Sequence, residues 1–207
     1  MNPERTVALL HSYLADREGR KRPDRLGRTG VLAAAELYRH GKISKICITV
    51  EPELSELLSS RLNTLLNNPP RGDIVAVPET VTTAQEITFF RELAEVNSWD
   101  DPPGNLVTIG NQEHLPRINR EIQKSYLPMR AMSTQEILSE YPRYKGILAE
   151  MDSWPEQKSQ RTWERILGAT EKMPLLANIM AKFGPRFYPK KIALQRLLFR
   201  LLEKKGL

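Results

Sequence analysis

Residues 28–66 read RTGVLAAAELYRHGKISKICITVEPELSELLSSRLNTLL. In residues 28–40 apolar side chains recur at helical spacing, and Gly41 follows them as a helix stop. Residues 45–50 form a short apolar run rich in β-branched side chains, which is typical of a strand buried on both faces. Helical spacing returns over residues 54–66. The stretch therefore predicts a helix, a buried strand and a second helix.

The same alternation extends along the chain in both directions. Further strands are predicted over residues 6–10, 73–77, 105–109 and, at an edge, 128–132, and further helices over residues 82–96 and 113–125. Strands separated by helices at this spacing indicate right-handed βαβ units, which build a parallel sheet covered on both faces. The predicted fold class is therefore α/β, with a parallel sheet of about five strands.

Composition restricts the class of protein. The chain has 207 residues, of which 40% are hydrophobic and 27% charged, as in an ordinary soluble protein. It lacks the run of about 20 apolar residues that a membrane span needs, and the apolar run at 6–10 is too short for a signal peptide. The single cysteine, Cys47, excludes a disulfide within the chain and is predicted to lie in the core. We expect a cytoplasmic protein.

The net positive charge lies entirely in the C-terminal third of the chain. Residues 1–141 hold 17 Lys and Arg against 19 Asp and Glu, whereas residues 142–207 hold 14 against 6. The strand pattern ends near Tyr141 and gives way to helical spacing. The expected organisation is an α/β domain over residues 1–140 and a basic helical extension over residues 141–207.

The extension is predicted to contain helices over residues 154–172, 174–183 and 189–205. The last of these has a broad apolar face flanked by Lys and Arg. This face could pack back on the α/β domain, or it could bind an anionic membrane surface or a protein partner. Nucleic acid is a less favoured partner, because aromatic and basic residues interleave only at residues 186–188.

Polar side chains gather where the predicted strands end, which is where open parallel sheets bind ligands. Hydroxyl groups, arginines and free backbone N–H groups at helix starts favour phosphate or carboxylate. The candidate ligand-binding residues are His11, Ser12, Arg28, Thr82, Thr83, Glu86, Asn111 and Arg117, and the candidate catalytic residues are His114 and Glu79. His114 and Arg117 are three residues apart near a helix start, so they share one helix face.

Several of these residues have a purely structural interpretation. Thr82 or Thr83 is expected to cap the helix that follows, with Glu86 completing a capping box. The charge-rich segment 16–25 reads as a solvated loop. The sequence contains no Walker A, GxGxxG, HExxH, GxSxG or CxxC motif, and its three histidines predict no metal site.

The motifs over residues 5–135 resemble those of the bacterial SanA/ElyC/YdcF-like domain, a family of largely undefined function. The matching positions are Leu37-Tyr38, Gly41-Lys42, Glu79, Thr83 and His114-Leu115-Pro116-Arg117. The resemblance implies a Rossmann-like sheet with a ligand site at its strand ends, and a nucleotide-type or S-adenosylmethionine-like ligand. The family's glycine-rich turn after the first strand is replaced here by residues 11–14, HSYL, and the negative charges of Glu51 and Glu86 would oppose an anion.

The leading hypothesis is a YdcF-like domain that binds a phosphate- or carboxylate-bearing small molecule and, if it is an enzyme, is a transferase or hydrolase. In this hypothesis Arg117 and Arg28 clamp the anion, Thr83 donates a hydrogen bond, and His114 acts as acid–base. The rival hypothesis is a non-catalytic adaptor that acts through the basic helix at 189–205.

Overall fold

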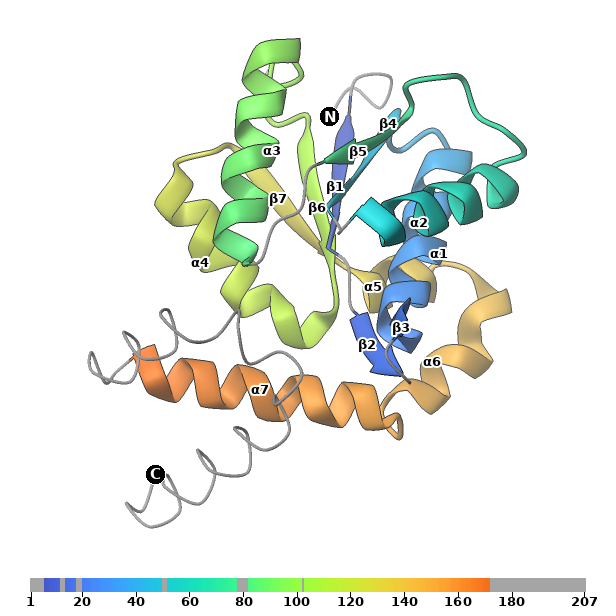
Figure 1. Ribbon diagram of the computed structural model, residues 1–207, viewed down its shortest axis with the longest axis vertical. Helices are drawn as coiled ribbons and strands as arrows, with labels where there is room; N and C mark the ends of the chain where they lie inside the picture. The colour runs from blue at the N-terminus through green and yellow to red at the C-terminus, as the bar shows by residue number, and fades with distance from the viewer. Residues whose placement is uncertain are drawn as a thin grey trace. The chain divides into compact units, whose positions relative to one another are not determined.

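The structure is a computed structural model that describes residues 6–11, 14–17, 20–49, 52–77, 82–101 and 103–171 (Figure 1). The chain divides into two compact units, Met1–Asp152 and Ser153–Leu207. The first unit is built around a parallel sheet of five strands. Its strands are β1 (Val7–His11), β4 (Lys45–Thr49), β5 (Ile74–Val77), β6 (Leu106–Gly110) and β7 (Met129–Ser133).

The strand order is β5-β4-β1-β6-β7, and each neighbouring pair is parallel. The first strand in the chain is therefore central, and the later ones are added first on one side of it and then on the other. This order confirms the predicted α/β class and its Rossmann-like arrangement, with β7 at an edge. The strand boundaries differ from the predicted ones by about one residue. His11 belongs to β1, because it still pairs with Thr49 in register.

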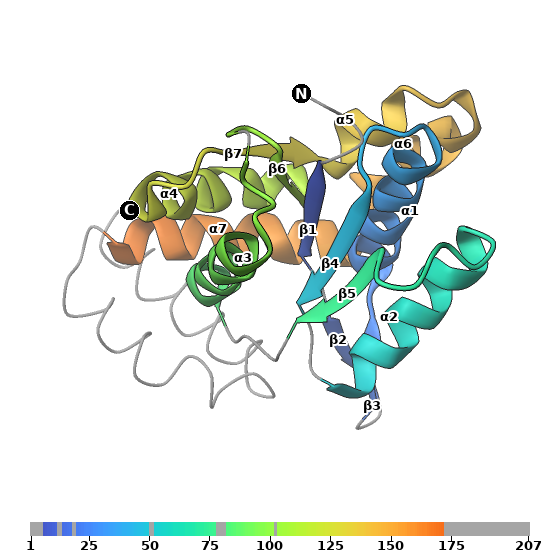
Figure 2. The same cartoon turned by 90° about the horizontal axis from the view of Figure 1, so that it is seen from above.

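Two helical layers cover the sheet, and Figure 2 shows them on opposite faces. One layer contains α1 (Arg25–Arg39), α2 (Pro52–Leu65) and α5 (Thr134–Ser139), and the other contains α3 (Thr83–Asn97) and α4 (Leu115–Ser125). Both β1 and β6 are buried along their whole length, as expected for central parallel strands.

Alternate residues of β1 point into the two halves of the core. Leu10 lies in the apolar cluster with α1, whereas Leu9 lies in the cluster with Phe90 of α3 and Ile118 of α4. Cys47 is fully buried in the second cluster, which confirms its predicted place in the core. Burial raises the pKa of the Cys47 thiol to about 12, against a small opposing effect of the Lys45 charge.

The prediction of a loop over residues 16–25 is wrong. The segment contains a two-stranded antiparallel hairpin, β2 (Leu14–Arg17) and β3 (Arg20–Pro23), and then enters α1. Asp24 is the N-cap of α1, and its carboxylate accepts a hydrogen bond from the backbone N–H of Gly27. Backbone pairing between neighbouring strands is compatible with charged side chains, so the polar composition did not reveal the hairpin.

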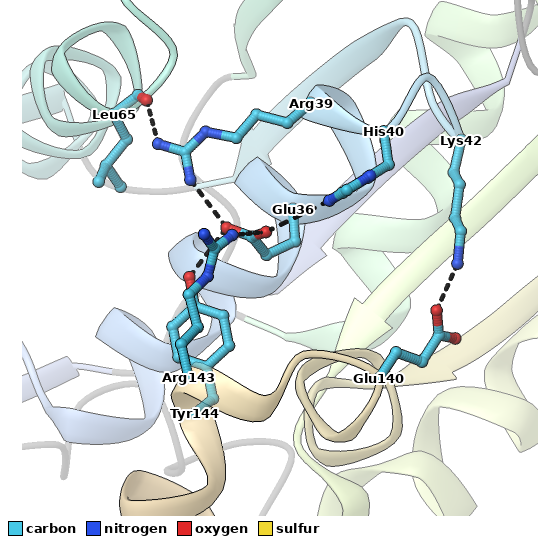
Figure 3. A network of polar contacts seen from close by, with 8 residues as sticks. All are labelled: Glu36, Arg39, His40, Lys42, Leu65, Glu140, Arg143 and Tyr144. Atoms are coloured by element: carbon cyan, nitrogen blue, oxygen red, sulfur yellow. Dashed lines mark hydrogen bonds and ion pairs between the residues drawn. The ribbon is translucent and has the colours of Figure 1, made fainter.

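A buried carboxylate joins α1 to the segment that follows α5 (Figure 3). The Glu36 side chain is inaccessible to solvent. It accepts hydrogen bonds from Arg39 at 2.8 Å, from the Tyr144 hydroxyl at 2.8 Å and from Arg143. Burial by itself raises the pKa of Glu36, but the hydrogen bonds from Tyr144 and Arg143 and the positive charges of Arg143 and Arg39 together outweigh it, so the pKa lies below its ordinary value.

The first unit reaches past residue 140, since Arg143 and Tyr144 complete this network. The short helices there are η3 (Pro142–Tyr144) and α6 (Lys145–Met151). In the second unit, α7 (Pro155–Glu171) confirms the helix predicted over residues 154–172. The helices predicted over residues 174–183 and 189–205 lie outside the described residues. Within the described part of the chain, no helix has the length and apolar character to cross a membrane.

We expect Cys47 to be unreactive in the native protein. A thiol with a raised pKa, buried between two helical layers, offers almost no thiolate to an electrophile. Titration with 5,5′-dithiobis(2-nitrobenzoic acid) should give no rapid reaction in buffer and one thiol per chain in guanidinium chloride. Rapid native labelling would contradict the core placement.

Replacing Glu36 by glutamine should lower the free energy of unfolding by about 2 kcal/mol at neutral pH, because charge-assisted hydrogen bonds at a buried group are lost. The matched control is Glu140→Gln, since Glu140 is 51% exposed and, among the described residues, forms its ion pair with Lys42 at the surface. That change should cost less than about 1 kcal/mol. Urea unfolding measures both.

The pH dependence gives a second check on Glu36. Since its pKa is lowered in the folded state, its contribution is fully present above the ordinary glutamate pKa of about 4.3 and is lost as pH falls through the lower, folded value. The difference in unfolding free energy between wild type and E36Q should therefore shrink in acid. A difference independent of pH would contradict the charged state of Glu36.

Candidate functional site

The carboxyl ends of β1 and β6 lie side by side at the centre of the sheet. From β1 the chain continues to α1 on one face, whereas from β6 it continues to α4 on the other. Such a reversal is the point at which open α/β sheets bind their ligands. His11 is the last residue of β1, and Asn111 follows β6 directly. Both are buried, each with 1% of its surface exposed.

His11 is paired with Glu86, which lies in the first turn of α3. The His11 Nδ1 atom is 2.5 Å from Oε2 of Glu86, and the contact is buried. An ionised carboxylate can only accept hydrogen bonds, so Nδ1 carries the proton and donates it. Glu86 therefore fixes the ring so that the opposite nitrogen, Nε2, is presented away from it.

A second histidine, His114, accepts hydrogen bonds from side chains of two helices. Its Nε2 atom is 3.0 Å from the Thr83 hydroxyl, 3.0 Å from Nε of Arg117 and 2.6 Å from Nη2 of Arg117. Arginine only donates, so Nε2 of His114 accepts and carries no proton in this arrangement. One ring lone pair thus faces donor groups of both Arg117 and Thr83.

The two histidines belong to one cluster. Their ring centroids are 5.4 Å apart with an interplanar angle of 59°, which is ordinary contact geometry for two rings. The His11 Nε2 atom is buried and has no hydrogen-bond partner among the described residues. A protein seldom buries a polar atom in this state, because the lost hydrogen bond to water costs about 1–3 kcal/mol.

Caps position these side chains. Thr82 is the N-cap of α3, and its capping box is completed by Gln85. The prediction that Glu86 completes the box is therefore wrong. Glu86 could complete it only if Thr83 were the N-cap, and its carboxylate accepts a hydrogen bond from His11 instead. The Asn111 side chain accepts from the backbone N–H of Glu113, which caps η2 (Gln112–His114) just before α4.

The structure brings five of the ten candidates together, and the others stand apart or serve as caps. The five are His11, Thr83, Glu86, His114 and Arg117. Thr82 and Asn111 cap helices. Arg28 is exposed in the first turn of α1 and makes no side-chain hydrogen bond or ion pair with the described candidates. Ser12 and Glu79 lie outside the described residues.

One supporting residue was missed in the sequence. The Gln135 side chain of α5 accepts a hydrogen bond from the backbone N–H of Gln112 and so fixes the start of η2. No local pattern connects these two residues, because the contact depends on how β6 and β7 pair. Among the residues that the structure describes, no group of three or more His, Cys, Asp or Glu could hold a metal ion.

Fold and cluster together define a class: a Rossmann-like α/β protein with two contacting histidines at the central strand ends. Comparisons of the chain with protein-family models, with curated proteins and with solved structures gave no match. The resemblance to the SanA/ElyC/YdcF-like domain therefore remains a prediction from the motifs.

The two neighbouring threonines should respond differently to substitution. Thr82→Ala removes the N-cap of α3 and should lower the free energy of unfolding by about 1 kcal/mol. Thr64→Ala, on the exposed side of α2, is the matched control and should change it by less than about 0.5 kcal/mol. Thermal unfolding followed by circular dichroism measures both. Equal effects of the two changes would argue against the cap.

Proposed function

We propose that this protein binds a small molecule bearing a phosphate or a carboxylate at the carboxyl ends of β1 and β6. The observation that carries the proposal is the meeting of Arg117 and Thr83 donors on one nitrogen of His114. An imidazole nitrogen offers a single lone pair, whereas an anion oxygen offers several. A bound anion would accept hydrogen bonds from both donor residues in better geometry.

The surroundings favour the same type of ligand. Thr83 is the first residue of α3, where backbone N–H groups and the helix dipole attract negative charge. Arg117 lies in the first turn of α4, so its side chain reaches the same point from a second helix. Glu86, whose charge opposes an anion, is held by His11 and is partly neutralised by it whenever that ring is protonated.

The resemblance to the SanA/ElyC/YdcF-like domain supports a nucleotide-type or S-adenosylmethionine-like ligand, and both belong among the ligands tested. Arg28 is left out of this proposal, because no hydrogen bond or ion pair joins its exposed side chain to the described residues of the cluster. His114 is a less suitable acid–base group than the motifs indicated, since its Nε2 is occupied by Arg117. It serves in this proposal as the acceptor that orients Arg117.

Arg117→Ala should weaken the binding of inorganic phosphate and of AMP by about 10- to 100-fold, the loss of a charged hydrogen bond worth about 1.5–3 kcal/mol. His114→Ala should weaken it as well, because Arg117 loses its orienting partner. Isothermal titration calorimetry with the full chain measures both.

The matched control for Arg117 is Arg130→Ala, which removes an exposed arginine of β7 from outside the cluster. It should leave the dissociation constant within about twofold of wild type. Unchanged affinity in both the Arg117 and His114 variants, with their melting temperatures preserved, would refute the anion site. So would the absence of binding by any phosphate or carboxylate ligand, with S-adenosylmethionine included in the panel.

A further inference from the structure

The strongest unexplained feature is the second nitrogen of His11. Its Nδ1 atom is committed to Glu86, and the ring as a whole is 1% exposed. The Nε2 atom is buried without a partner among the described residues, next to the ring of His114. A buried nitrogen with an available lone pair, held in a fixed direction by a carboxylate, is the arrangement of a general base.

We propose that His11 is the proton acceptor of a hydrolytic site, oriented by Glu86, and that its substrates are phosphate monoesters. This inference rests on the proposed function, since Arg117 and Thr83 must hold the phosphate. Phosphate is favoured over carboxylate because its three non-bridging oxygens can accept from the Arg117 fork, from Thr83 and from the start of α3 together.

The reaction consumes one water molecule. Its oxygen forms a bond to phosphorus while His11 Nε2 takes one of its protons, and the bond between phosphorus and the ester oxygen breaks. The electron pair leaves with the ester oxygen, which lies opposite the attacking water and takes a proton from solvent, while Nε2 releases its proton to solvent. The products are an alcohol and inorganic phosphate, and His11 returns to its neutral form. Glu86 stabilises the imidazolium that forms between the two transfers.

The groups around His11 determine how its activity depends on pH. Among the described residues, Glu86 of α3 and His114 of η2 are the titratable groups in contact with His11, and Arg117 of α4 contacts His114. Since neutral His11 is the base, kcat/KM should rise with pH to a plateau. Glu86→Gln keeps a hydrogen-bond acceptor but removes the negative charge, so the midpoint of this rise should move to lower pH.

The test uses the full chain and p-nitrophenyl phosphate, with release of p-nitrophenolate followed by absorbance. His11→Asn should lower kcat by about 10²- to 10⁴-fold, the range for loss of a general base, while KM changes by less than about threefold. Glu86→Gln should lower kcat and shift the pH profile as described. Controls are His40→Asn and Glu140→Gln, which replace exposed residues at the opposite end of α1 and beyond α5 and should leave turnover unchanged.

Binding of inorganic phosphate, measured by calorimetry on the same proteins, separates the two proposals. If phosphate binds but wild type releases p-nitrophenolate no faster than His11→Asn, the hydrolytic role is overturned and the anion site stands. If phosphate does not bind to wild type, the anion site itself fails. If circular dichroism shows that His11→Asn does not fold, His11→Gln replaces it in the turnover assay. The pH profile of Glu86→Gln tests the role of Glu86 separately, and an unshifted midpoint overturns that role.

Discussion

The central position of β1 is the constraint on which the rest of the structure depends. Because β1 pairs with β4 on one side and β6 on the other, the chain must leave its two middle strands toward opposite faces of the sheet. The carboxyl ends of these strands are then adjacent, while α1 and α4 pack on opposite faces of the sheet. His11 and His114, more than a hundred residues apart in sequence, come into ring contact only for this reason.

Buried polar groups at the two ends of the sheet differ in how fully they are hydrogen-bonded. At the amino end, the Glu36 carboxylate is fully buried, and partners from three residues satisfy it. It thereby joins α1 to the segment after α5. At the carboxyl end, His11 is equally buried but keeps one nitrogen without a described partner. A satisfied buried group stabilises a fold, whereas an unsatisfied one lowers its stability unless a ligand completes it. This contrast separates the structural network from the candidate site.

Helix starts connect the site to the scaffold. The first turn of α3 follows the cap Thr82 and carries both the donor Thr83 and Glu86, whose carboxylate meets His11 of β1. In α4, Arg117 lies one turn from His114 and bonds it directly. The side chains of the cluster thus stand on regular elements, and α3 and η2 each begin at a side-chain cap, which restricts their position.

The sequence by itself determined the five strands of the parallel sheet, the helices between them and most of the residues of the candidate site. Apolar runs such as residues 45–50, with helical spacing on both sides, indicate strands that are buried in a parallel sheet. Polar residues at the predicted strand ends indicated where a ligand site would lie. Only the tertiary structure decided which of them meet. Glu86 was assigned to a cap and Arg28 to an anion, because local patterns report neighbours along the chain. The pairing of His11 with Glu86 depends on the path of α3 across the sheet, which no local pattern contains.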